Sequence, residues 1–175
     1  MEQLSQEHIS HIKRFITGLQ EQLTPVGNFL NESFLGNLVR GEGAFYVFHT
    51  SDFAGNLEYY PPGPSGVRIS CFYYSSVPSN IFPDAPVQEL RKIAADEGVE
   101  IYEVSPELLN HQIRLGYEEV PMFPENKPSL TLDEFLQMVY RTSRAASLAR
   151  QVEQRYSSQI KLFYNEPDET SATDL

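Results

Sequence analysis

The side chains best suited to covalent or acid–base chemistry are those of Cys71, His49 and Tyr73. If the segments that carry His49 and Cys71 form neighbouring strands, the imidazole can activate the thiol as a nucleophile. Cys71, however, lies between Ser70 and Phe72 in an apolar segment, where a free cysteine usually acts as a small buried hydrophobic side chain. A small-molecule enzyme, a transferase or hydrolase with a pocket near these three residues, is therefore the alternative interpretation and not the favoured one.

Other signatures of catalysis or metal binding are absent from the sequence. It contains no phosphate-binding loop, nucleophile elbow, HExxH, GxGxxG or EF-hand pattern. The single cysteine excludes an internal disulfide and a cysteine-based metal cluster. His8 and His11 lie three residues apart in a predicted helix, but a metal site needs a third ligand and the sequence marks none. We therefore expect no metal and no cofactor.

The composition is typical of one globular domain with a strong acidic balance. The 175 residues include 24 acidic and 13 basic side chains, which gives a formal net charge of −11. This charge repels phosphate backbones and anionic lipids, so we expect no nucleic-acid partner and no membrane partner. An acidic protein that mimics DNA is a further alternative. No apolar leader and no stretch of about eighteen apolar residues is present, which favours a cytoplasmic location.

Two segments dense in Val, Ile, Phe and Tyr predict the main strands of a sheet, at 44–50 and 67–76. The first is apolar on both faces, which is typical of a strand inside a sheet that is covered on both sides. The second places Val67, Ile69, Cys71 and Tyr73 on one face and Arg68, Ser70, Phe72 and Tyr74 on the other. Shorter strands are predicted at 57–60, where the strand lies at an edge, at 99–104 and at 117–123.

Helical spacing and capping residues predict helices at 6–23, 25–39 and 84–97, and a short one from Ser105 to Gly116. The order of strand, helix and strand across 67–104 predicts a parallel pair of strands joined by a right-handed crossover. The fold class is α+β: a mixed sheet of about four strands, helices on both faces and a long C-terminal helix.

The C-terminal quarter of the chain predicts one long helix. Thr131 and Glu134 form a capping box, and no Gly or Pro interrupts the chain from there to Tyr164. The apolar positions drift slowly round this helix, as in a seven-residue repeat. A helix of this length exceeds what packing within one domain requires, so we expect a protein partner or self-association through residues 132–163. The predicted units are an α+β core domain (1–128), the long helix (129–164) and a disordered acidic tail (165–175).

Acidic and basic residues are concentrated in different segments of the sequence. Residues 96–134 hold ten acids and two bases, whereas residues 135–163 hold five bases and one acid. Arg141, Arg144 and Arg155 fall on one stripe of the long helix. The stripe can lie against acids of its own chain or meet an acidic surface of a partner, and such complementarity mainly sets orientation and encounter rate.

These patterns favour a non-enzymatic protein–protein interaction protein, either a regulatory adaptor or a subunit of a larger assembly, which docks through its C-terminal helix. A second contact is predicted beside the proline-rich loop 61–66, because tyrosines next to a stiff loop lose little entropy on binding. The expected binding residues are Tyr59, Tyr60, Arg141, Arg144 and Arg155.

Overall fold

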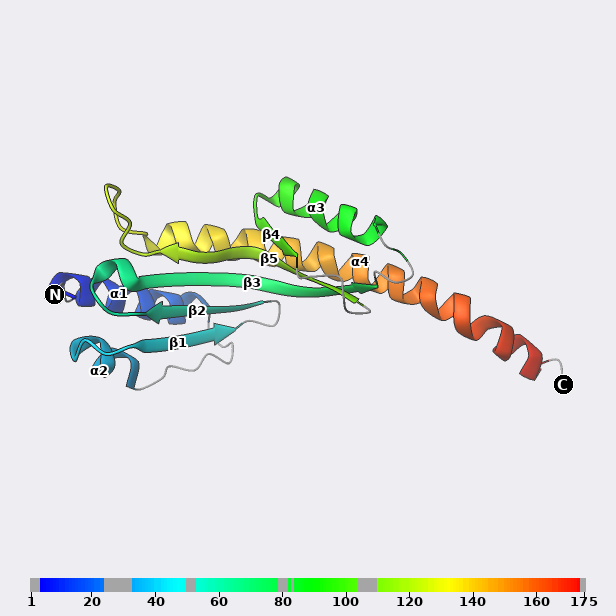
Figure 1. Cartoon of the computed structure of the whole chain (residues 1–175), viewed down its shortest axis with the longest axis horizontal. Helices are drawn as coiled ribbons and strands as arrows, with labels where there is room; N and C mark the ends of the chain where they lie inside the picture. The colour runs from blue at the N-terminus through cyan, green and yellow to red at the C-terminus, as the bar shows by residue number, and fades with distance from the viewer. Residues whose placement is uncertain are drawn as a thin grey trace.

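A five-stranded antiparallel sheet forms the centre of the protein, with strand order β1-β2-β3-β5-β4 (Figure 1). The computed structural model describes residues 4–23, 33–49, 53–78, 82, 84–103 and 110–173, and all their side chains except those of Leu23, His49, Asn110, His111 and residues 161–173. The strands are β1 (Ala44–His49), β2 (Ala54–Tyr59), β3 (Val67–Pro78), β4 (Glu100–Glu103) and β5 (Asn110–Pro121). The helices are α1 (Gln6–Leu23), α2 (Ser33–Val39), α3 (Ala85–Glu97) and α4 (Leu132–Thr173), with a 3-10 turn at Pro64–Gly66.

All four described helices pack on one face of the sheet, which we call the closed face. Its side chains, among them Tyr46, Leu57, Cys71 and Leu115, are buried. The other side is the open face. The predicted cover of helices on both faces is therefore wrong, although the α+β class and the long C-terminal helix are confirmed. The sheet is also antiparallel with five strands, where the sequence predicts a mixed sheet of about four.

Segment 44–50 forms an edge strand, although its composition predicts a strand inside the sheet. Its apolar residues on both sides suggest a central strand, but β1 pairs only with β2 in the described part of the chain. Phe45 and Val47 point away from the helices and are 42% and 37% exposed. β2, predicted as an edge strand at 57–60, instead lies between β1 and β3.

Two hydrophobic clusters form the core, and α4 contributes to both. In the first, the ring of Phe135 on α4 lies 5.5 Å from that of Phe15 on α1 and 5.7 Å from that of Phe48 on β1. In the second, α3 and α4 pack over β3 and β5. Small side chains at Ala145 and Ala149 are fully buried there, which allows α4 to approach the sheet closely.

The predicted capping box of α4 is confirmed. The Glu134 backbone N–H donates to Thr131 Oγ1 at 3.1 Å, and the Thr131 N–H donates to Glu134 Oε1 at 3.4 Å. From there α4 runs unbroken for 42 residues, about 63 Å at 1.5 Å per residue, and its C-terminal part extends past the end of the sheet (Figure 1). Residues 165–173, predicted to be a disordered tail, are helical. Extending a formed helix requires no new nucleus, which favours this continuation, although Pro167 within it lacks the backbone N–H that helical hydrogen bonding uses.

The segment before α4 differs from its prediction. β5 occupies 110–121, so the predicted short helix is wrong over residues 110–116, while Ser105 and the rest of 104–109 lie outside the described residues. Ile113, Leu115 and Tyr117 all lie on the closed face, and a spacing of two residues is that of a strand. Since β3 and β4 are both antiparallel to β5, they run parallel as predicted, but β5 lies between them.

The N-terminal helices follow the sequence more closely. Ser5 caps α1 as predicted, because its Oγ accepts the N–H of His8 at 3.1 Å. The helix predicted at 25–39 is described only over α2, and residues 24–32 lie outside the described residues. Gly98 ends α3 in the left-handed region at φ 71°, as expected for a glycine at a helix C-terminus.

Candidate functional site

The open face of the sheet is the candidate site, because it is the large surface of this fold that no described helix covers. Alternation along the strands brings polar and aromatic side chains from all five strands to it. They are Phe45, Val47, Asn56, Glu58, Arg68, Ser70, Phe72, Tyr74, Glu100, Tyr102, Arg114, Glu118 and Glu119.

A β-bulge concentrates carboxylates at the centre of this face. The register between β3 and β5 shifts between Ile69 and Cys71, so that two residues of β5, Glu118 and Glu119, lie opposite the single residue Ser70. Glu119 has a φ of 53°, which is uncommon for a residue with a side chain. The bulge thus turns two successive carboxylates toward the same side of the sheet, where a regular strand would present one.

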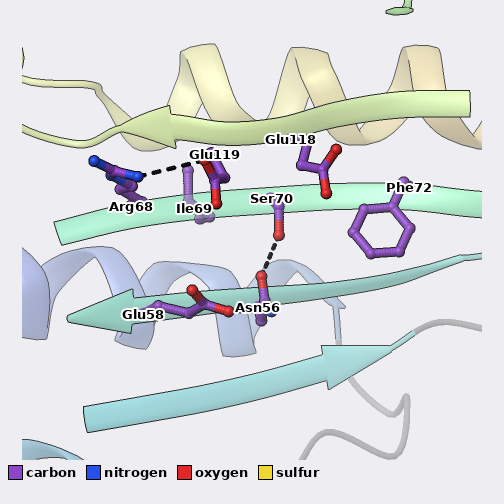
Figure 2. Close-up of a pocket in the computed structure, with 8 residues that line it drawn as sticks. All are labelled: Asn56, Glu58, Arg68, Ile69, Ser70, Phe72, Glu118 and Glu119. Atoms are coloured by element: carbon purple, nitrogen blue, oxygen red, sulfur yellow. Dashed lines mark hydrogen bonds and ion pairs between the residues drawn. The ribbon is translucent and has the colours of Figure 1, made fainter. Parts of the chain in front are cut away.

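A shallow cleft of about 100 Å³ lies between β2 and β5. Figure 2 shows Glu58 on one side of it and the bulge carboxylates on the other. At its floor the Ser70 hydroxyl donates to Asn56 Oδ1, and Asn56 Nδ2 donates to Glu58 Oε1 at 2.9 Å. Arg68 lies 3.4 Å from Glu119 at the rim. The cleft is polar and predominantly acidic, and it is large enough for one side-chain head group.

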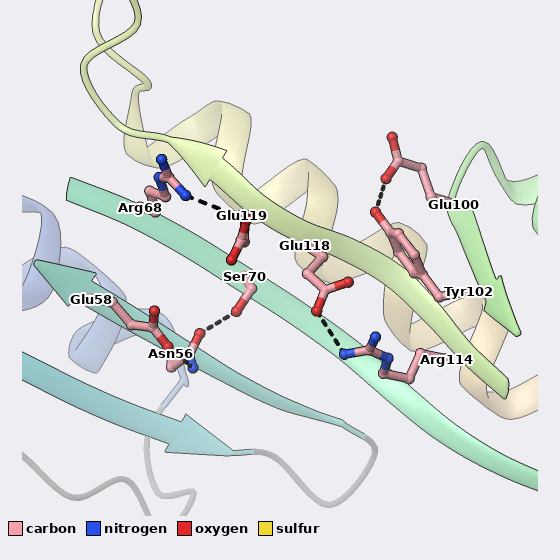
Figure 3. Close-up of polar contacts among 9 residues, drawn as sticks. All are labelled: Asn56, Glu58, Arg68, Ser70, Glu100, Tyr102, Arg114, Glu118 and Glu119. Atoms are coloured by element: carbon pink, nitrogen blue, oxygen red, sulfur yellow. Dashed lines mark hydrogen bonds and ion pairs between the residues drawn. The ribbon is translucent and has the colours of Figure 1, made fainter. Parts of the chain in front are cut away.

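Next to the cleft, the guanidinium of Arg114 lies among three aromatic rings. Its Cζ is 5.6 Å from the ring centroid of Phe72, 5.8 Å from that of Tyr74 and 5.5 Å from that of Tyr102. Arg114 Nη1 also contacts Glu118 Oε1 at 2.6 Å (Figure 3). Its Nε is buried without a hydrogen-bond partner in the described part of the chain. The arrangement combines cation–π contacts with a charged hydrogen bond.

Tyr102 and Tyr60 mark two ends of the face. Burial, with the Glu100 carboxylate that accepts its hydroxyl hydrogen bond, raises the pKa of Tyr102 to about 12. The charge of Glu58 raises the pKa of Tyr60. Both phenols therefore stay neutral and act as donors to carboxylates.

The predicted tyrosine pair divides between core and surface. Tyr59 is 1% exposed and belongs to the first core cluster, so its side chain offers no surface contact. Tyr60 is 60% exposed next to Pro61. Of the pair, only Tyr60 is placed where a partner can reach it.

The arginines of α4 face acids of their own chain, which is one of the two arrangements that the charge pattern allows. Arg144 Nε lies 2.8 Å from Glu97 Oε2, and Arg155 Nη1 lies 2.6 Å from Glu89 Oε1. Arg141 is exposed on the same helix. Exposed ion pairs of this kind contribute about 0–1 kcal/mol to folding stability. They therefore help to orient α3 against α4 but add little to the stability of the fold.

Cys71 and Tyr73, two of the three residues of the enzymatic alternative, make contacts with α4 on the closed face. Cys71 is fully buried on the closed face with its Sγ 3.6 Å from Thr142 Oγ1, and burial raises the pKa of its thiol to about 12. The Tyr73 hydroxyl donates to Glu153 Oε2 at 2.9 Å. His49 ends β1, and its side chain lies outside the described residues. A neutral, enclosed thiol is a poor nucleophile.

The two N-terminal histidines make structural contacts. The ring of His8 packs edge-on against Phe123 at 4.7 Å, and His11 Nε2 lies 3.0 Å from the carbonyl oxygen of Leu130. Among the described residues, no group of three or more His, Cys, Asp or Glu side chains is arranged to hold a metal ion. None of the described helices combines the length and apolar character that crossing a membrane requires.

Comparison of the chain with protein-family models, with curated proteins and with solved structures gave no match.

The sequence predicts the part of the open face that β3 contributes. The alternation of Arg68, Ser70, Phe72 and Tyr74 along one side of β3 is confirmed. The β5 residues Arg114, Glu118 and Glu119 were missed because the sequence divides β5 between a helix and a strand. One signal was present: Gly116 interrupts an otherwise strand-like segment, and an isolated glycine in a strand often marks a bulge.

Proposed function

We propose that this chain is a non-enzymatic protein–protein interaction protein, a regulatory adaptor or subunit of an assembly, which docks a second copy of itself through the end of α4. The observation that carries the proposal is the continuation of α4 beyond the sheet (Figure 1). The apolar stripe of α4 is used internally as far as Tyr156, which is 8% exposed in the second core cluster. The docking segment that we propose is therefore shorter than 132–163 and lies further toward the C-terminus, at 157–173.

The sequence of this segment suits pairing of two helices. It carries four apolar or aromatic residues, Ile160, Leu162, Phe163 and Tyr164. Burying such side chains contributes about 1.5–3 kcal/mol each. Lys161 lies within this group and the acids Glu166, Asp168 and Glu169 follow it, so an antiparallel pair brings the lysine of one copy toward the acids of the other.

The other two interpretations have less support. The raised pKa and full burial of Cys71 argue against a thiol enzyme. A DNA mimic needs its acids along one surface, whereas Glu118 and Glu119 lie on the open face and Glu97 pairs with Arg144 beside the helices.

Light scattering tests the proposal. We expect the full chain to have twice its 20.0 kDa monomer mass, and a chain ending at Ser158 to have the monomer mass with an unchanged circular dichroism spectrum in the strand region. Phe163→Glu should also give a monomer, because a charge cannot be buried in the pair. Tyr140→Glu, on an exposed site of the same helix, is the matched control and should keep the dimer. A full chain at monomer mass, or a dimer that survives both changes, would contradict the proposal.

A further inference from the structure

We propose that the open face of the sheet binds an extended, arginine-bearing segment of a partner protein. This site is separate from the end of α4 and does not depend on docking there. Its first support is exposed aromatic and apolar surface: Phe45, Val47 and Tyr74 are 42%, 37% and 57% exposed on a face that no described helix covers. Aromatic side chains on such a surface are typical of protein contacts.

The chain itself shows which group this surface accepts. Arg114 lies within 5.8 Å of three ring centroids and forms an ion pair with Glu118. A guanidinium is planar and weakly hydrated, so it stacks on rings and pairs with carboxylates at the same time. The ring of Phe72, which lines the cleft together with Glu118 and Glu119, offers the same combination of ring and carboxylates to an arginine from outside.

The charges of the face favour a cation. It carries four carboxylates, Glu58, Glu100, Glu118 and Glu119, and two guanidinium groups, those of Arg68 and Arg114. The arginines pair with the bulge carboxylates. In the described part of the chain, Glu58 and Glu100 accept hydrogen bonds from neutral donors, the Asn56 amide and the Tyr102 hydroxyl. Their negative charge is available to a ligand.

The same charges disfavour other occupants. A second copy would set two net-negative faces together within a chain of net charge −11, and a nucleic acid would add phosphates to them. The cleft of about 100 Å³ between Glu58 and the bulge takes one side-chain head group. The ligand that fits is an extended segment that inserts one arginine there and lays apolar side chains over Tyr74 and Val47.

Binding of a labelled peptide that alternates arginine and leucine tests this inference on the full chain. We expect binding that weakens with salt, several-fold weaker binding when lysine replaces arginine, and none when glutamate does. Glu58→Gln with Glu100→Gln should raise the Kd about tenfold. Tyr74→Ala should raise it about fivefold, because the apolar side chains of the peptide lose their contact with this exposed ring.

Matched controls separate the site from general charge attraction. Glu7→Gln with Glu125→Gln removes the same charge from exposed positions off the open face, and Tyr140→Ala removes an exposed ring from α4. Both should leave the Kd unchanged. The inference would be overturned if the arginine peptide did not bind. It would also be overturned if the control variants weakened its binding as much as the open-face variants do. The chain ending at Ser158 should still bind the peptide, so failure of the α4 proposal and failure of this one are distinguishable.

Discussion

Glu153 carries a carboxylate into the contact between α4 and the closed face of the sheet. Its Oε1 accepts the Ser75 hydroxyl at 2.6 Å, and its Oε2 accepts the Tyr73 hydroxyl at 2.9 Å. The guanidinium of Arg150 lies 5.3 Å from the centroid of the Tyr73 ring. Two hydroxyl donors and a nearby cation stabilise a charge that would be costly to bury alone. Tyr73, which the sequence suggested as a catalytic group, is thus part of the joint between helix and sheet.

This network predicts a loss of stability at alkaline pH. Burial first, and then the hydrogen bond and charge of Glu153, raise the pKa of Tyr73 from 10.0 to about 12, against the opposing charge of Arg150. The unfolded chain releases the phenol proton near pH 10 and the folded chain only near pH 12, so the stabilisation is complete below pH 10 and is lost as pH rises to 12. Urea midpoints measured across this interval should fall for the native sequence and fall less steeply for Tyr73→Phe.

The control for this prediction is the same chemical change at an exposed position. Tyr140→Phe alters a hydroxyl that is exposed on α4 and should leave the alkaline slope as it is in the native protein. Equal slopes for Tyr73→Phe and the native protein would show that Tyr73 does not carry the effect. Tyr102, whose pKa is also raised to about 12, would then be the next side chain to test.

At the scale of single elements, Gly116 allows close pairing of β5 with β3 beside the bulge. Its φ of 150° is one that other residues rarely adopt, and a Cβ at this position would overlap the Cys71 carbonyl oxygen and the Phe72 backbone. The glycine lets β5 approach β3 closely just before the bulge, where Glu118 and Glu119 both face the open side of the sheet.

Gly116→Ala should therefore destabilise the protein by about 2–4 kcal/mol, because strain and overlap add. Gly41→Ala is the matched comparison. Gly41 also has a positive φ, of 73°, but a Cβ there would meet nothing within 4 Å, so its cost should be about 1 kcal/mol of strain alone. Denaturant midpoints measure both. If Gly116→Ala costs no more than Gly41→Ala, close packing at the bulge is not what requires the glycine.

The elements that the sequence predicts well are those whose signals are local. Helix α1 with its Ser5 cap and helix α4 with its Thr131 and Glu134 box follow from spacing and capping within a few residues. The strand order does not, because it depends on pairing between distant segments, and β5 enters the sheet between two strands that precede it. The part of the open face on β1 does not follow from the sequence for the same reason, because the apolar Phe45 fits a core position until the edge position of β1 is known.

At the scale of the whole molecule, α4 joins the two core clusters into one unit. Its first turns supply Phe135 and Val139 to the cluster with α1 and α2, and later turns supply Ala149 and Val152 to the cluster with α3. The ion pairs between α4 and α3 also join the two parts of the molecule, since Arg144 and Arg155 of α4 pair with acids of α3. The division of the chain at residue 128, which the sequence suggests, separates two parts that share one core.

The chain ending at Pro128 should consequently fail to fold. It loses Phe135, Leu136, Val139 and Val152, all buried. At about 1.5–3 kcal/mol each, their burial contributes about as much as the whole net stability of a typical domain, 5–15 kcal/mol. Circular dichroism and thermal melting should show no cooperative transition for this chain, whereas the chain ending at Ser158, which keeps all four side chains, should melt cooperatively. A cooperative melt of residues 1–128 alone would mean that the sheet and α1–α3 form a core without α4, and that α4 is an added arm rather than the element that completes the fold.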